Sequence, residues 1–246
     1  MNFLLHRYLA VRDLRDPLAG IGAMLPDLWR MADRRVRALR LEPGGAVAAP
    51  EPGGAAASSE LLAVLRGIEH HLEVDRWFHG ADVFAEGERL AVERIRATGL
   101  ATPKLALFGH IAWELCLDGA LIRRDGLPRT LRDLADGFAA ADQGPARAAA
   151  ARHHFDRHGR PSADRDAFDD GLRQLFAEIS RGPWIAGYQD GAGIAQRIDG
   201  VRRRLGFARL TTDERTRFGA ALETLTPDAD AGLAAIDALG RTRSDQ

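Results

Sequence analysis

The feature that most constrains the fold of this chain is a helical spacing of apolar residues along most of its 246 residues. Leucine, valine, isoleucine and aromatic side chains recur three or four positions apart, which places them on one face of an α-helix. No stretch alternates apolar and polar residues as a half-buried strand does. We therefore predict an all-α fold, a compact helical bundle formed by a single domain, 1–246. The predicted helical stretches are 60–97, 104–122, 129–141, 165–180 and 213–239.

Two helix starts and three interruptions are visible within this pattern. Thr212 before Asp213 and the sequence Thr226-Pro227 are typical of helix N-termini. Residues 43–59 consist largely of Gly, Pro, Ala and Ser, and such a composition buries too little apolar surface to offset the entropy of ordering. We expect a flexible low-complexity insert at 43–59, a second break near 142–164, and a frayed tail at 241–246.

Composition excludes several classes of protein. Lys and Arg number 34 against 35 Asp and Glu, so we expect no nucleic-acid partner bound through bulk positive charge. Cys116 is the only cysteine, which rules out an internal disulfide and a cysteine-based zinc cluster, and we expect it to be a small buried hydrophobe. The N-terminus does not resemble a signal peptide and we expect no membrane span, so a cytoplasmic protein is predicted. The oligomeric state stays open.

Two stretches carry metal-ligand side chains at one-turn intervals. On a helix, residues four apart lie nearly above one another, so each set forms a polar stripe that drifts by about 80° over its length. A polar stripe on a buried helix is unfavourable unless its members are paired or bind a cation. The first stripe is His71, Asp75 and His79, and the second is His110, Glu114 and Asp118.

Two such helices facing each other could hold a mono- or dinuclear metal site. Imidazole and carboxylate ligands together suit Zn, Mn or Fe, and carboxylate-rich sites also accept Mg. His6 and Asp27 could join the site, although His6 could equally be a satisfied core histidine and Asp27 a turn or cap residue. A third group, His153, His154 and His158, contains ligand types but reads as an exposed loop. A solvated pair or hydrogen bond is the simpler interpretation of any one His–acid pair.

At these residues the chain resembles the acyl carrier protein phosphodiesterases, all-helical relatives of the HD phosphohydrolases. The opening MNFLLH is similar to the family's MNFLAH, and residues 22–27 are similar to its G-N-x-x-x-D element. Residues 67–77 resemble its G-I-x-x-H-x-x-I-D-x-F motif, and Glu114 with Asp118 its D-x-x-x-D-H element. Residues 184–204 resemble its C-terminal W-L-x-x-Y…G-I…R pattern. The similarity runs through most of the chain outside 43–59.

The chain also departs from the family pattern. Ala23 replaces the family's Asn, His79 replaces an acidic residue, and Ala81 replaces a His. Gly119 stands where the D-x-x-x-D-H element has its His, and His110 is an addition. Because several replacements are still metal-ligand types, a rearranged metal site is one reading. A diverged substrate or an inactive relative is another.

The resemblance implies an HD-like fold and hydrolysis of the phosphodiester that joins 4′-phosphopantetheine to holo acyl carrier protein, aided by Mn or Mg. Zn or Fe is an alternative metal. The metal would be held by Asp27, His71, Asp75, Glu114 and Asp118, with His6 and His110 as additional ligands. Asp27, His79 and Glu114 would act in catalysis. Carrier proteins are acidic, so exposed arginines could dock them, although a solvated helix face also explains an arginine run. The docking candidates are Arg34, Arg35, Arg37, Arg202 and Arg203. The alternatives are an inactive binding or scaffold protein on the same fold, or a hydrolase of another phosphoester.

Overall fold

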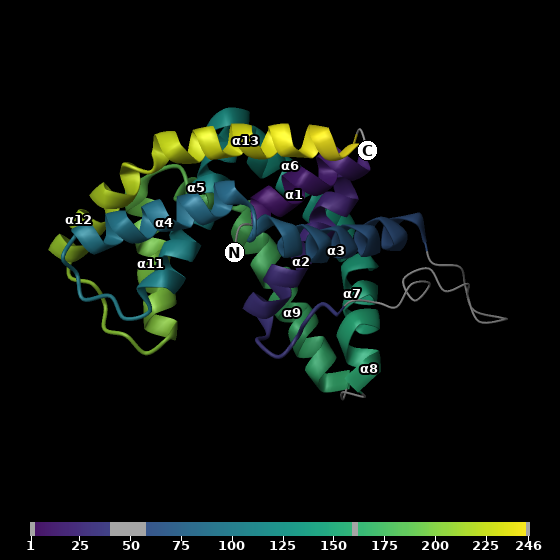
Figure 1. Ribbon diagram of the computed structural model, residues 1–246. Helices are drawn as coiled ribbons and strands as arrows, with labels where there is room; N and C mark the ends of the chain where they lie inside the picture. Colours follow the sequence, from purple (N-terminus) through teal and green to yellow (C-terminus); the bar gives the residue numbers. More distant parts are fainter. Residues whose placement is uncertain (1–2, 40–57, 159–161, 245–246) are drawn as a thin grey trace. The chain divides into compact units, whose positions relative to one another are not determined.

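A computed structural model describes residues 3–39, 58–158 and 162–244 of the chain (Figure 1). All regular elements of these residues are helices, with no strand among them, which confirms the predicted all-α class. The elements are α1 (Phe3–Leu14), α2 (Pro17–Ala32), α3 (Ser59–Phe78), α4 (Asp82–Ala97), α5 (Leu105–Asp125), α6 (Leu127–Asp142), α7 (Pro145–Ala150), a π-helical turn (Ala151–Phe155), α8 (Asp156–His158), α9 (Ser162–Ser180), α10 (Pro183–Ala186), α11 (Gly191–Arg204), α12 (Thr212–Glu223) and α13 (Thr226–Ser244).

The described residues group into two compact units, each made of separate stretches of the chain. Residues 3–76 and 131–181 form what we call the N-terminal unit, and 77–130 with 182–244 form the C-terminal unit. The predicted insert 43–59 lies outside the described residues except for its last two residues, Ser58 and Ser59, and α3 begins at Ser59. Helix α13 continues to Ser244, so its backbone is helical through most of the predicted tail 241–246.

In the N-terminal unit, α1 packs against α2, and α2 lies in close backbone contact with α3. Asp16 caps the start of α2 by accepting hydrogen bonds from the amides of Leu18 at 2.9 Å and Ala19 at 3.2 Å. A methyl group added at Gly22 or at Gly67 would overlap the backbone of the facing helix. Glycine at these two positions therefore lets α2 and α3 approach closely enough for a backbone group of α2 to contact a side chain of α3.

In the C-terminal unit, α5 is the central helix and contacts α4, α11 and α13. The ring of Trp113, on α5, fills the space that a side chain at Gly87 of α4 would need. By length and composition α5 is long and apolar enough to span a membrane, but 78% of its most apolar window is buried inside the protein. Such burial is typical of a core helix. Cys116 is buried on this helix, as expected.

Two details of the predicted helices are wrong. The stretch 60–97 is not one helix, because α3 ends at Phe78 and α4 begins at Asp82 after a turn through Gly80. The segment 142–164, predicted as a break with an exposed loop, is helical over 145–158, and His153 and His154 are buried there. The alanine-rich run after Pro145 favours a helix more strongly than the neighbouring Gly and Pro oppose it.

Candidate metal centre

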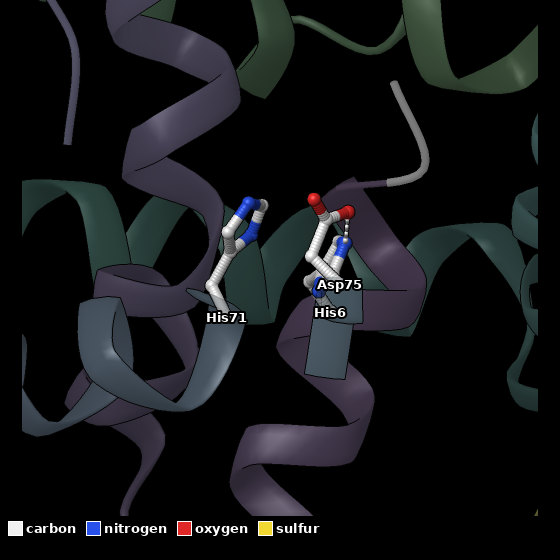
Figure 2. A group of neighbouring side chains, drawn as sticks. All are labelled: His6, His71 and Asp75. Carbon is white, nitrogen blue, oxygen red and sulfur yellow. Dashed lines mark ion pairs between the residues drawn. The ribbon is translucent and has the colours of Figure 1, made fainter. Parts of the chain in front are cut away.

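Three predicted site residues meet in the N-terminal unit, and we call them the His6 cluster: His6, His71 and Asp75. His6 comes from α1, while His71 and Asp75 lie one turn apart on α3. Figure 2 shows the imidazole of His71 and the carboxylate of Asp75 projecting from α3 toward the same side, with His6 beside Asp75. One ligand atom from each residue lies within 4.8 Å of the other two. The His6 cluster therefore has the residue types and spacing of a metal site.

A backbone hydrogen bond fixes the orientation of His71. Its Nδ1–H donates to the carbonyl oxygen of Ala23 on α2, at 2.8 Å. Because a carbonyl can only accept, the proton of the neutral imidazole resides on Nδ1, and Nε2 keeps its lone pair. Histidine ligands in metal sites are typically oriented by such a bond to their other nitrogen. A backbone group of Ala23, and not a side chain, therefore orients His71.

The His6 cluster is buried on one side and reachable from water on the other. His6 and His71 are only 2% and 5% exposed, and their ring centroids lie 3.9 Å apart. The side chain of Asp75 is 48% exposed, and its Oδ1 lies 3.9 Å from Nε2 of His6. A cation held here would thus have two buried imidazole ligands and one carboxylate ligand that is exposed to solvent.

Three more predicted residues meet in the C-terminal unit, and we call them the Glu114 cluster: His79, His110 and Glu114. His79 directly follows α3, whereas His110 and Glu114 lie one turn apart on α5. Oε1 of Glu114 is 3.4 Å from Nε2 of His110 and 3.7 Å from Nε2 of His79. The prediction that His79 shares a stripe with His71 and Asp75 is therefore wrong. His79 lies beyond the end of α3 and groups with His110 and Glu114 of α5.

The charge of Glu114 is stabilised by its neighbours. Burial by itself raises the pKa of this carboxyl group, yet nearby positive charge and the imidazoles of His110 and His79 hold it well below its usual value. The contact with Glu114 in turn raises the pKa of His110, although partial burial opposes the shift. Glu114 is therefore a carboxylate, and the cluster favours positive charge beside it.

Asp27 and Asp118 belong to neither cluster. Among the described residues, no group of three ligand side chains within 4.8 Å includes either of them. Asp27 is half-buried on α2. Asp118 is fully buried on α5, and its charge adds to the burial that raises the pKa of Tyr188. Asp118 lies two turns along α5 from His110, so the drift of the helical stripe turns it toward different neighbours.

The arginines predicted to dock a partner differ in their surroundings. Arg34, Arg35, Arg37 and Arg203 are exposed, and Arg35 forms an ion pair with Asp33 at 2.7 Å. The prediction that Arg202 docks a partner is wrong, because this residue is only 7% exposed and does not present its charge at the surface. Its guanidinium lies 5.7 Å and 5.8 Å from the ring centroids of Phe108 and Phe207, where cation–π attraction holds it.

Sequence reasoning missed two groups that orient the histidines. One is the carbonyl of Ala23, and no side chain signals a backbone acceptor. The other is Glu88 of α4, whose Oε2 lies 3.4 Å from Nδ1 of His110. Glu88 is one of several acidic residues in its helix, and only the packing of α4 against α5 distinguishes it.

In comparisons with known proteins, no family model matches the chain, and no curated protein or solved structure matches it.

Proposed function

We propose that this chain is a divalent-metal-dependent phosphodiester hydrolase with the His6 cluster as its metal centre. The observation that carries the proposal is the grouping of His6, His71 and Asp75, whose ligand atoms lie within 4.8 Å of one another, with the His71 ring oriented by the Ala23 carbonyl. The three side chains fit a divalent ion by charge and donor type, because one carboxylate and two neutral imidazoles suit Mn, Zn or Fe, and Mg less well. An HD-like arrangement of the helices is part of this proposal.

The residues of the cluster would divide the work between them. His71 and His6 would hold the ion from the dry side, with the Ala23 carbonyl keeping the His71 ring in place. Asp75 would supply the negative ligand and, being half exposed, leave the remaining coordination positions open to water and substrate. A bound divalent ion lowers the pKa of its water and so supplies hydroxide for attack on a phosphoryl group.

The resemblance supports a substrate class. It implies the phosphodiester between 4′-phosphopantetheine and a serine of holo acyl carrier protein. An acidic carrier protein would be attracted by exposed arginines, for which Arg34, Arg37 and Arg203 remain candidates. A reaction of this kind would take place in the cytoplasm. Hydrolysis of a different phosphoester, or binding without hydrolysis on the same fold, are the alternatives that an experiment must separate.

The test compares two adjacent histidines. Purified protein would be assayed with a generic aryl phosphodiester and with holo carrier protein, in the presence of Mn, Mg, Zn or Fe(II). We expect His71→Ala and Asp75→Asn each to reduce kcat/KM by about 100-fold or more. His70→Ala is the matched control, because Nε2 of His70 lies 2.9 Å from Asp13 and His70 belongs to neither cluster.

Two results would contradict the proposal. Absence of turnover with every metal and both substrates would favour a binding protein. Equal activity of Asp75→Asn and the wild type would remove the His6 cluster from the reaction, whatever the substrate.

A further inference from the structure

The Glu114 cluster has the dimensions of a four-coordinate metal site. Bonds of about 2.0–2.1 Å to a tetrahedral ion place neighbouring ligand atoms about 3.4 Å apart. The distances from Oε1 of Glu114 to Nε2 of His110 and of His79 are 3.4 Å and 3.7 Å. Small rotations of the two rings would therefore bring all three atoms to bonding distance of one ion.

Glu114 contributes a deeply buried carboxylate to the cluster, a negatively charged ligand for a cation. Glu114 is 3% exposed, and a carboxylate at that depth is unfavourable unless a cation or several donors compensate for the lost water. The side chains of His79 and His110 are 33% and 28% exposed, so a metal ion could enter past them from solvent. The two imidazoles are thus the partly exposed members of the cluster, and the carboxylate is its buried member.

The surroundings also resemble those of histidine metal sites. Glu88 lies on the Nδ1 side of His110, opposite the nitrogen that approaches Glu114. A carboxylate behind a ligating histidine orients the ring and makes it a better ligand. The ring of Phe84 lies 4.7 Å from that of His79 and 5.1 Å from that of His110, which keeps one wall of the cluster apolar.

We propose that His79, His110 and Glu114 form a second divalent-cation site, of the zinc class, that binds its own ion. Two imidazole nitrogens and one carboxylate suit Zn, Co or Fe(II) and disfavour Mg and Ca, which take oxygen ligands. Three protein ligands leave the fourth position for water, as catalytic zinc sites do. The site does not rest on the proposed hydrolase function, because its residues differ from those of the His6 cluster.

The experiment measures metal binding without any assay of activity. The full-length protein would be stripped with a chelator, reconstituted with Zn, passed through a desalting column and analysed for metal per chain. Titration with Co(II) would report coordination through its visible absorption, and circular dichroism would verify the helical content of each variant. We expect Asp75→Asn to retain one equivalent of zinc, the ion of the Glu114 cluster, whatever the His6 cluster of the wild type holds.

The variants separate ligands from bystanders. Glu114→Gln should abolish that equivalent, and Glu88→Gln should weaken zinc binding about 10- to 100-fold. Glu86→Gln, also on α4 but exposed and paired with Arg89, should leave it unchanged. If Glu114→Gln does not fold, His79→Gln at the half-exposed edge provides the same test.

Three outcomes would overturn the proposal. One is a wild type that retains no zinc after reconstitution. Another is zinc content that is unaffected by both Glu114→Gln and His79→Gln. The last is a single equivalent that disappears in Asp75→Asn, since that ion would then belong to the His6 cluster.

Discussion

A single methyl group at Gly67 should loosen both the α2–α3 packing and the His6 cluster. A Cβ at this position would lie 2.8 Å from the carbonyl carbon of Ala19 and from the amide nitrogen of Ala23, and would overlap the Ala19 carbonyl oxygen. Ordinary contacts begin at 3.4 Å, so the helices must separate by at least about 0.6 Å, and further to relieve the oxygen. Ala23 also supplies the oxygen that orients His71.

The expected loss of stability follows from three contributions. Overpacking of a buried contact costs about 1–3 kcal/mol, and weakening the buried His71 hydrogen bond costs about 1 kcal/mol. Replacing glycine by alanine inside a helix returns about 1 kcal/mol. The net loss for Gly67→Ala is about 2 kcal/mol, which lowers Tm by about 4–8 °C for a chain of this size.

Gly200→Ala is the matched control. Gly200 lies inside α11, and a Cβ there would meet no atom within 4 Å. Only the helix propensity changes, so Tm should rise by about 2–4 °C. Thermal unfolding followed by circular dichroism measures both variants, and titration with Co(II) tests whether Gly67→Ala also weakens metal binding by the His6 cluster. A Gly67→Ala protein as stable as Gly200→Ala would refute the close backbone contact between α2 and α3.

Three further predictions concern other parts of the molecule. Burial raises the pKa of Cys116 to about 12, so this thiol should react with a disulfide reagent only when the protein unfolds, and rapid reaction of the native protein would contradict its burial. Burial likewise raises the pKa of Asp169 despite its ion pair with Arg147 at 2.8 Å. A raised pKa in the folded protein adds stability at pH values below the ordinary aspartate pKa. This stability is lost as the pH rises through the pKa of Asp169 in the folded protein. Denaturant unfolding at several pH values between these two pKa values should therefore show the stability of the wild type falling relative to that of Asp169→Asn. Thr211→Ala removes the capping box with Glu214 and should cost about 1 kcal/mol in urea unfolding, whereas an unchanged midpoint would mean that the cap is frayed in solution.

Local signals in the sequence predict helix starts well because the groups that make them are close in the chain. Thr211 accepts a hydrogen bond from the amide of Glu214 at 3.2 Å, and α12 begins at Thr212, where the Thr-Asp-Glu pattern predicts a start. Helix α13 begins at Thr226, again as predicted. A cap needs only its own turn, so no knowledge of the tertiary fold is required.

The candidate site was only partly predictable because each cluster combines local and distant residues. The pairs His71–Asp75 and His110–Glu114 are one-turn neighbours on a helix, and the sequence shows them directly. The predicted grouping of His79 is wrong. A helix that continues past Phe78 would place His79 on the same stripe as His71. The turn through Gly80 ends α3 first, and a single such turn within an apolar pattern is hard to distinguish from a helical glycine.

The two clusters are built in the same way, and this bears on which metals they could hold. In each cluster, a His and a carboxylate lie one turn apart on a helix, and a second imidazole comes from another segment. A hydrogen-bond acceptor at Nδ1 orients the ring of the helical His. This acceptor is the Ala23 carbonyl for His71 and Glu88 for His110. In the Glu114 cluster two of the three donors are imidazole nitrogens, which favours Zn or Fe(II) over Mg. His79→Asp should therefore reverse that preference in competition between Zn and Mg, and an unchanged ratio would mean that His79 does not ligate the ion.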